Sequence, residues 1–440
     1  MSHSRSLCDW IVRAIECVAN VALAAMLVLA LSPGFAEPAS AQSYTLTLLY
    51  SFTGPPDGEG PLGIVLDSQG NLYGSTQYGG LPSCGPVQRP LISCGTVFKL
   101  DTSGQETVLH RFTFNNGDGM VPFSEGSVIR DSQGNLYGTT YYGGDPRCFP
   151  GGEYYGCGIV FKLDPSGRET VLHTFEGASQ GDGAAPAAPL VQDGLGNLYG
   201  TTGNGGDGQC NSPFGGPPGC GTVFKIDTAG HETVLHRFIG GNVDGELPSG
   251  LILDAQGNLY GTTTFGGTYQ YGTVFRVDPS GNETVLYSFR GIGTGDGATP
   301  ISGLTRDAQG NLYGTTLDGG INNCDTVTPG CGTVFKLNAS GQETVLYRFI
   351  GTGGDGRSPF STLVLDSAGN LYGVTAFEDS GTAFKVDASG HETVLYSFND
   401  GEPFQLLAVP GQQGSFYGAM YISSDNGPGA IFKLTPSGQR

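Results

Sequence analysis

The sequence predicts an all-β fold, a seven-bladed β-propeller made of four-stranded antiparallel blades. The first observation is a repeated motif, Asp-x-x-Gly-Asn-Leu-Tyr-Gly, which begins at residues 67, 131, 193, 254, 307 and 366 and has a degenerate copy at 414–418. Successive copies lie 45 to 64 residues apart, a period typical of repeat architectures. The second is a strand-like segment resembling Gly-Thr-Val-Phe-Lys-Leu, which begins at residues 95, 158, 221, 272, 332, 381 and 429. The third is Glu-Thr-Val-Leu, which follows only the first six of these segments.

Each repeat supplies four short strands, which we call A to D. In the first repeat they are predicted at residues 61–66, 71–76, 95–100 and 106–112. All are rich in β-branched and aromatic residues and are bounded by turn residues such as Asp and Gly. Four antiparallel strands in every repeat indicate the blade of a propeller. Lys99 is expected to face Glu106 across the hairpin between C and D, as an exposed ion pair.

The two ends of the chain predict how the ring closes. The seventh repeat stops where its strand D should begin, and residues 47–52 match residues 393–398 of the sixth strand D. The N-terminal strand is therefore expected to complete the last blade, which removes exposed sheet edges. The predicted domain spans 42–440, with blades at 53–113, 114–175, 176–238, 239–289, 290–349, 350–398, and 399–440 plus 42–52.

This closure also predicts two different faces. Strand D is outermost and strand A innermost, so the tight A–B and C–D turns share one face, which we call the turn face. The B–C loops and the D–A crossovers share the opposite face, which we call the loop face. Variable loops on a rigid scaffold commonly carry binding sites. We therefore expect the loop face to hold the site.

Residues 1–41 are predicted to be a secretory signal peptide. Arg5 and Arg13 precede the apolar run 18–31, and Ala39-Ser40-Ala41 resembles a cleavage site. Two acidic residues near the start leave an uncleaved anchor as the alternative, although the apolar run is shorter than the ~20 residues of a spanning helix. The mature protein is expected to be secreted, extracellular or periplasmic, without a membrane span.

The formal net charge of −20 disfavours nucleic acid and anionic membrane surfaces as partners, because phosphate recognition needs a basic surface. It is compatible with a cation binder. We expect a monomer whose partner is an extracellular glycan or protein.

Eight cysteines follow the signal, in pairs that each fall within one B–C loop: Cys84/Cys94, Cys148/Cys157, Cys210/Cys220 and Cys324/Cys331. Four loop-closing disulfides in an oxidising compartment are the economical interpretation. Zinc is the alternative, although no Cys-x-x-Cys occurs and no histidine recurs nearby.

Aspartates recur in the D–A crossovers, six of them within Asp-Gly-x-x-Pro: Asp57, Asp118, Asp182, Asp244, Asp296, Asp355 and, in a shortened form, Asp400. One interpretation is a ring of carboxylates near the channel mouth that holds Ca²⁺ or a cationic ligand. The other is a turn, in which Asp caps, Gly takes an unusual dihedral and Pro opens strand A. We expect no cofactor other than this calcium.

The B–C loops differ between blades and are rich in aromatic residues. Candidates for ligand binding are Tyr78, Tyr141, Tyr142, Tyr154, Tyr155, Phe265, Tyr269, Tyr271, Phe377 and Tyr421. Such rings suit carbohydrate or peptide recognition, and packing within the loops is the alternative. His110, His173 and His236 share one position of strand D that holds Tyr in other blades, which favours a structural role.

The three motifs, in this order, resemble the GloVer-type tandem repeat of secreted bacterial proteins, over residues 60–440. The resemblance implies export and brings no established activity. A weaker likeness to NHL and lyase-type propellers concerns the fold alone.

Two functions follow from the sequence. The first is a secreted binding or scaffold module whose ligand contacts the loop face, without catalytic residues. The alternative is an extracellular lyase or glycosidase-like enzyme with an acidic site at the channel mouth. Fold alone does not choose between them.

Overall fold

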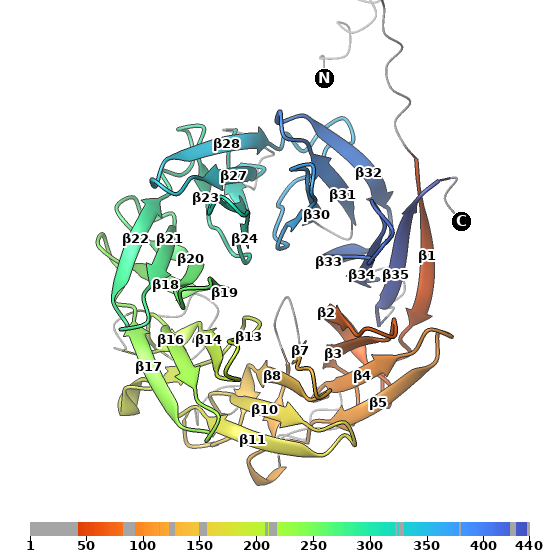
Figure 1. Cartoon of the computed structure of the whole chain (residues 1–440), viewed down its shortest axis with the longest axis vertical. Helices are drawn as coiled ribbons and strands as arrows, with labels where there is room; N and C mark the ends of the chain where they lie inside the picture. Colours follow the sequence, from red (N-terminus) through yellow and green to blue (C-terminus); the bar gives the residue numbers. More distant parts are fainter. Residues whose placement is uncertain are drawn as a thin grey trace, which may run out of the picture. The chain divides into compact units, whose positions relative to one another are not determined.

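The computed structural model describes residues 43–81, 93–113, 115–122, 128–148, 156–206, 210, 218–321, 324, 330–377, 380–422 and 428–437. The unit Ser43–Arg440 forms a ring of antiparallel sheets (Figure 1), which confirms the seven-bladed propeller. The predicted signal peptide lies outside the described residues. Within them, the helical structure is two 3-10 turns, Asn115–Gly117 and Ala178–Gln180, and no helix has the length and apolar character to span a membrane.

Each blade runs from strand A near the centre of the ring to strand D at its perimeter (Figure 1). Blades 1 to 3 are β2 (Glu59–Leu66), β3 (Leu72–Tyr78), β4 (Thr96–Leu100), β5 (Glu106–Arg111); β7 (Val128–Arg130), β8 (Leu136–Thr140), β10 (Ile159–Leu163), β11 (Glu169–Thr174); and β13 (Val191–Gln192), β14 (Leu198–Thr202), β16 (Thr222–Ile226), β17 (Glu232–Arg237). Blades 4 and 5 are β18 (Gly245–Pro248) with β19 (Ile252–Leu253), β20 (Leu259–Gly266), β21 (Thr273–Val277), β22 (Glu283–Ser288); and β24 (Thr305–Arg306), β25 (Leu312–Thr316), β27 (Thr333–Leu337), β28 (Glu343–Arg348). Blades 6 and 7 are β29 (Val364–Leu365), β30 (Leu371–Phe377), β31 (Ser380–Val386), β32 (Glu392–Phe398); and β33 (Glu402–Ala408), β34 (Phe416–Tyr421), β35 (Ala430–Pro436), β1 (Tyr44–Ser51).

The N-terminal strand closes the ring as the sequence predicts. β1 pairs antiparallel with β35, with Leu46 opposite Leu434 and Ser51 opposite Ala430. The two ends of the domain thus lie side by side (Figure 1). Among the described residues, β1 alone supplies strand D of blade 7, so this pairing satisfies the backbone of β35 that would otherwise form an open edge.

Strand A is interrupted in most blades at one position of the crossover motif. In three blades, two residues ahead of strand A pair with two residues that follow strand B. These two-stranded sheets are β6 (Gly119–Met120) with β9 (Tyr142–Gly143), β12 (Gly183–Ala184) with β15 (Asn204–Gly205), and β23 (Gly297–Ala298) with β26 (Asp318–Gly319). In five blades the residue directly before this proline has a positive φ: Val121, Ala185, Leu247, Thr299 and Ser358. This corrects the expectation that the glycine after Asp takes the unusual dihedral. That glycine is required for space instead, since a Cβ on Gly119 would lie 2.4 Å from the Thr140 side chain.

The core consists of aromatic contacts between successive blades. The phenylalanine at the end of each strand D packs on the phenylalanine of strand C in the next blade, with ring centroids 5.0 to 5.3 Å apart at all seven junctions. The glycine of strand B is needed here, because a Cβ on Gly74 would lie 2.7 Å from the Phe98 ring. The Gly-Asn-Leu-Tyr-Gly and Thr-Val-Phe-Lys motifs therefore fit together sterically within each blade.

The register of the C–D hairpin contradicts the expected ion pair between Lys99 and Glu106. Lys99 lies opposite Thr107, while Glu106 lies opposite Leu100. Because side chains alternate between the two faces of a strand, this register puts the ammonium and the carboxylate on opposite faces of the blade. The Lys99 ammonium lies over the Tyr73 ring, 5.8 Å from its centroid. Glu106 instead faces the preceding blade.

Candidate functional site

Polar side chains meet at the junctions between neighbouring blades, near the outer strands. Each cluster contains a Tyr or His near the end of strand D, the crossover Asp that follows it, and the Glu that begins strand D of the next blade. Six such clusters occur in the described part of the chain: Tyr50/Asp57/Glu106, His110/Asp118/Glu169, His173/Asp182/Glu232, His236/Asp244/Glu283, Tyr287/Asp296/Glu343 and Tyr347/Asp355/Glu392. We call the three with histidine the His junctions and the three with tyrosine the Tyr junctions.

The crossover aspartate caps its turn, as one of the two sequence interpretations expects. Asp118 is 8% exposed, and its Oδ2 accepts hydrogen bonds from the backbone N and the Oγ1 of Thr113. Its Oδ1 accepts a hydrogen bond from the N of Gly119 at 2.7 Å. Asp244 accepts equivalent bonds from Ile239 and Gly245. These backbone donors fix the carboxylate before any ligand arrives.

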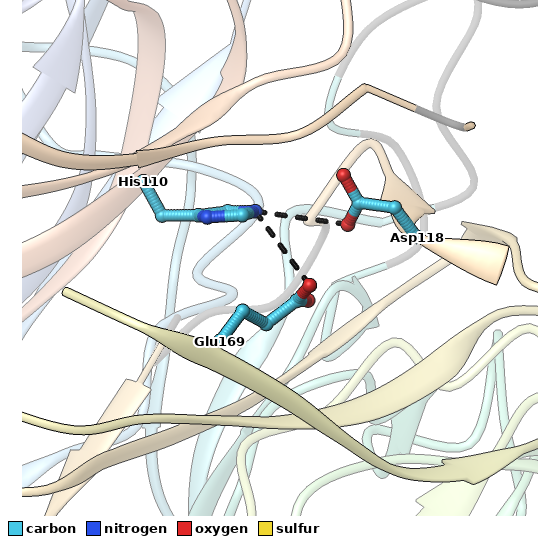
Figure 2. Close-up of side chains that lie close together, drawn as sticks. All are labelled: His110, Asp118 and Glu169. Atoms are coloured by element: carbon cyan, nitrogen blue, oxygen red, sulfur yellow. Dashed lines mark ion pairs between the residues drawn. The ribbon is translucent and has the colours of Figure 1, made fainter. Parts of the chain in front are cut away.

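The imidazole of each His junction points at this carboxylate. His173 Nε2 lies 3.2 Å from Asp182 Oδ2, and His236 Nε2 lies 3.3 Å from Asp244 Oδ2. At the first His junction the Nε2 of His110 lies 3.6 Å from Asp118 Oδ1 and 3.9 Å from Glu169 Oε2, as Figure 2 shows. Two strands of adjacent blades, β5 and β11, thus contribute to one cluster.

The glutamate of each cluster has one oxygen without a hydrogen-bond partner. Its Oε1 is buried without a hydrogen-bond partner in all six junctions. Burial and the neighbouring Asp118 carboxylate raise the pKa of Glu169 from 4.5 to about 7. The same two causes, burial and the crossover Asp, raise the pKa of Glu283 and of Glu343 to about 7. Burial also opposes ionisation of Asp118, but the nearby His110 side chain and hydrogen bonds from Thr113 outweigh it and hold the pKa of Asp118 below its ordinary value.

A tyrosine hydroxyl replaces the imidazole in the Tyr junctions. Tyr287 donates a hydrogen bond of 2.7 Å to Asp296 Oδ2, and Tyr50 donates one of 2.9 Å to Asp57 Oδ2. Burial and this bond raise the pKa of Tyr287 far above its ordinary value. A Tyr junction therefore offers a hydrogen-bond donor where a His junction offers a ring nitrogen.

The seventh junction lacks the cluster. Asp400 is exposed in its shortened crossover, and the foreign strand β1 has no glutamate at the position that would face it. The structure thus distributes the crossover aspartates among separate junctions beside the outer strands, and it does not gather them in one place. The glutamates were not expected at these junctions, because Glu106 was predicted to face Lys99 across the C–D hairpin. Blade 7 lacks both this glutamate and the full crossover motif. Their joint absence is the sequence signal that could have linked the glutamate to the crossover aspartate.

Most of the aromatic candidates in the B–C loops pack against the protein. Tyr78 and Tyr142 contact a core cluster, and the Tyr141 and Tyr142 rings meet edge-to-face with centroids 4.6 Å apart. Tyr271 also packs against the core, and Phe265 and Tyr421 are half-buried. Tyr269, in contrast, is 48% exposed. Tyr154 and Tyr155 lie outside the described residues, as does the side chain of Phe377.

Three of the four predicted disulfides are present: Cys148–Cys157, Cys210–Cys220 and Cys324–Cys331. Cys94 is also disulfide-bonded, and its predicted partner Cys84 lies outside the described residues. In each of the three loops with a disulfide, a glycine at the start of the loop forms a parallel β-bridge with a glycine near its end, as between Gly143 and Gly156. The loops are therefore closed at their bases.

The ring of seven blades and its repeated junctions define a tandem-repeat β-propeller. The chain belongs to the Gloeobacter/Verrucomicrobia repeat family, whose model matches residues 37–212 and 93–328. This confirms the resemblance seen in the sequence. Among curated proteins none matches this chain.

Two solved structures are similar to this chain at low identity. One is a provisionally assigned gluconolactonase, 12% identical, with a TM-score of 0.40 over 91% of this chain and 93% of that chain. Another is a gluconolactonase from Xanthomonas campestris, 15% identical, with a TM-score of 0.41 over 91% of this chain and 93% of that chain. At these values the likeness carries no information about activity or site residues.

Proposed function

We propose that this protein is an exported binding module whose ligand, an apolar segment of a peptide or protein, contacts the loop face at blade 4. The observation that supports it is a group of exposed apolar side chains there. Val243 is 74% exposed, Ile239 is 50% exposed and Tyr269 is 48% exposed. We call these three residues the blade 4 patch.

Two contacts bring the members of the patch together. Gly245 pairs with Gly266, which joins the end of the crossover to the start of the B–C loop. Gln270 follows Tyr269, and Asn242 precedes Val243. The Nε2 of Gln270 donates a hydrogen bond of 2.9 Å to the Oδ1 of Asn242. A tyrosine and two aliphatic side chains beside amide groups suit an apolar peptide segment, since such surfaces mark interaction sites when they group together.

The rest of the loop face supports a binding role. Disulfides and β-bridges hold the bases of several B–C loops, while the turns of the opposite face have almost the same sequence in each blade. Disulfides also suit an extracellular or periplasmic compartment. Export agrees with the signal peptide predicted from the sequence.

The test is binding of the mature protein to immobilised peptide and glycan arrays, with patch and control variants. Tyr269→Ala and Val243→Ser should each weaken peptide binding by about tenfold, the usual effect of truncating a central contact residue. Leu195→Ser is the matched control, because Leu195 is 81% exposed but lies in an A–B turn on the opposite face. Binding that survives both patch substitutions would refute the proposal. Turnover of glycans or polyuronates would favour the enzyme alternative.

A further inference from the structure

The His junctions differ from the Tyr junctions in one respect that bears on ligands. At each of them, an imidazole nitrogen, an Asp oxygen and a Glu oxygen lie within 4.8 Å of one another. The histidine comes from one blade, and the crossover aspartate and the glutamate come from the next. The three sites occupy consecutive junctions, from blade 1 to blade 4.

The spacing of these atoms suits a shared cation. Zinc binds His nitrogen and carboxylate oxygen at about 2.0–2.2 Å, so ligand atoms of a tetrahedral site lie roughly 3.3–3.6 Å apart. The observed separations from the histidine Nε2 are 3.2 Å at His173, 3.3 Å at His236, and 3.6 and 3.9 Å at His110. Small side-chain rotations would bring all three donors of each site to bonding distance.

One carboxylate oxygen lacks a hydrogen-bond partner at all three sites, and at the first site the imidazole nitrogen lacks one too. The Oε1 atoms of Glu169, Glu232 and Glu283 are buried without a hydrogen bond, and so is the Nε2 of His110. A buried acceptor without a partner destabilises the fold by about 1–3 kcal/mol. Either a proton or a cation must compensate the two adjacent carboxylates of each site.

Other features of the clusters agree with metal binding. The crossover aspartates are held by backbone N–H groups, so each carboxylate is oriented in advance, as metal ligands usually are. The side chains of the three histidines are 17, 19 and 20% exposed, which leaves the sites open at the surface. A ring nitrogen favours transition metals over calcium, which takes six to eight oxygen ligands.

We propose that the three His junctions each bind one divalent transition-metal ion, with zinc as the reference case. The ligands are His110, Asp118 and Glu169 in the first site and the corresponding triads in the next two. Water fills the remaining position. Each ion joins the outer strands of two blades, so it stabilises the ring between blades 1 and 4. The Tyr junctions bind none, because a tyrosine hydroxyl that donates to the carboxylate replaces the nitrogen ligand.

The experiment uses the mature protein after dialysis against a chelator. The protein is equilibrated with micromolar Zn²⁺ or Co²⁺, freed of excess metal and analysed by elemental mass spectrometry, with Co²⁺ absorption as the spectroscopic signature. Three ions per chain are expected. Zn²⁺ should also raise the thermal midpoint of unfolding, since it binds only the folded state.

The chain itself provides conservative variants. His110→Tyr, His173→Tyr and His236→Tyr each introduce the residue that other junctions carry, so the fold should persist, as circular dichroism would verify. Each should lower the stoichiometry by one and the triple variant should bind no metal. Glu283→Gln is a second, smaller change that should also remove one ion. His231→Gln is the matched control, because His231 is exposed beside Asp227 in a C–D turn and should leave the stoichiometry at three.

Two results would overturn the inference. One is failure of the chelated wild-type protein to take up Zn²⁺ or Co²⁺ at micromolar concentration, which would show that the imidazoles are ion-pair partners alone. The other is metal uptake that persists in the folded triple His→Tyr variant. The blade 4 patch is tested separately by peptide binding, although the backbone N of its Ile239 donates a hydrogen bond to Asp244 of the third site.

Discussion

Replacing the glutamates of the Tyr junctions by glutamine should stabilise the protein at alkaline pH and leave its stability unchanged in acid. Burial and the adjacent crossover aspartate raise the pKa of Glu106, Glu343 and Glu392 from 4.5 to about 7. Glutamine has nearly the same shape as the protonated acid and carries no charge. The triple variant Glu106→Gln/Glu343→Gln/Glu392→Gln therefore isolates the ionisation of these three groups.

The sign follows from proton linkage. Below pH 4.5 the glutamates are protonated in both the folded and the unfolded chain, so the variant and the wild type should be equally stable. Between pH 4.5 and 7 the unfolded glutamates lose their protons while the folded ones retain them, and the wild type loses stability as the pH rises. Above pH 7 the difference reaches a plateau.

The size of the plateau can be worked from the structure. The change of pKa from 4.5 to about 7 corresponds to at most about 3.4 kcal/mol per group. Solvent reaches the edge of each junction, and Arg290 and Arg348 offset part of the repulsion at Glu343, so we take about 1 kcal/mol per group. A domain of about 400 residues has an unfolding entropy near 0.8 kcal/mol/K. The three substitutions together, at about 3 kcal/mol, should therefore raise the thermal midpoint of unfolding by roughly 4 °C.

The assay is thermal unfolding by circular dichroism from pH 4 to pH 9 in the presence of a chelator. Glu176→Gln is the control, because Glu176 is exposed and its removal reports only the general effect of one fewer negative charge on an acidic protein. A triple variant that is less stable than the wild type at pH 8, or equally stabilised at pH 4.5 and pH 8, would refute the reasoning.

Three further predictions concern the ring itself. Gly281→Ala should destabilise the fold by about 2–4 kcal/mol in urea denaturation, since its Cβ would lie 2.8 Å from a carbonyl oxygen of the preceding blade at a φ of +87°. Gly230→Ala has the same φ but its nearest atom is at 4.0 Å, so it should cost only about 1 kcal/mol, and equal costs would contradict the packing argument. Deleting residues 44–51 should expose the last strand and cause concentration-dependent association in size-exclusion chromatography, whereas a persistent monomer would argue against closure as the strand's role. Replacing Cys148 and Cys157 together by serine should lower the free energy of unfolding by about 2–3 kcal/mol in urea titration, and no change would show that the loop base is held by other contacts.

Much of the fold follows from local chemistry that the sequence displays. Strand boundaries in the first blade were predicted to within two residues, because turn residues bound each run of β-branched and aromatic side chains. The match between residues 47–52 and 393–398 was sufficient to place the N-terminal strand beside β35. The spacing of the cysteines also predicted the three disulfides that the structure describes, since each pair lies within one short loop.

The clusters between blades could not be read in the same way. Glu169 is 51 residues from Asp118 in the sequence, and only the packing of one blade against the next brings the start of β11 to the crossover that follows β5. The register of the hairpin decided whether Glu106 met Lys99 or the neighbouring blade, and a shift of one residue would have reversed the answer. Exposure was equally hidden, as Tyr269 is open to solvent while Tyr142, in an equivalent loop, packs in the core.

The sequence by itself determined the repeat, the number of blades and the closure of the ring, because these depend on residues that are neighbours along the chain or copies of one another. Only the tertiary structure decided which carboxyl groups meet and which aromatic rings reach solvent. Those properties depend on how one blade packs against the next, and the side chains that meet there belong to different repeats.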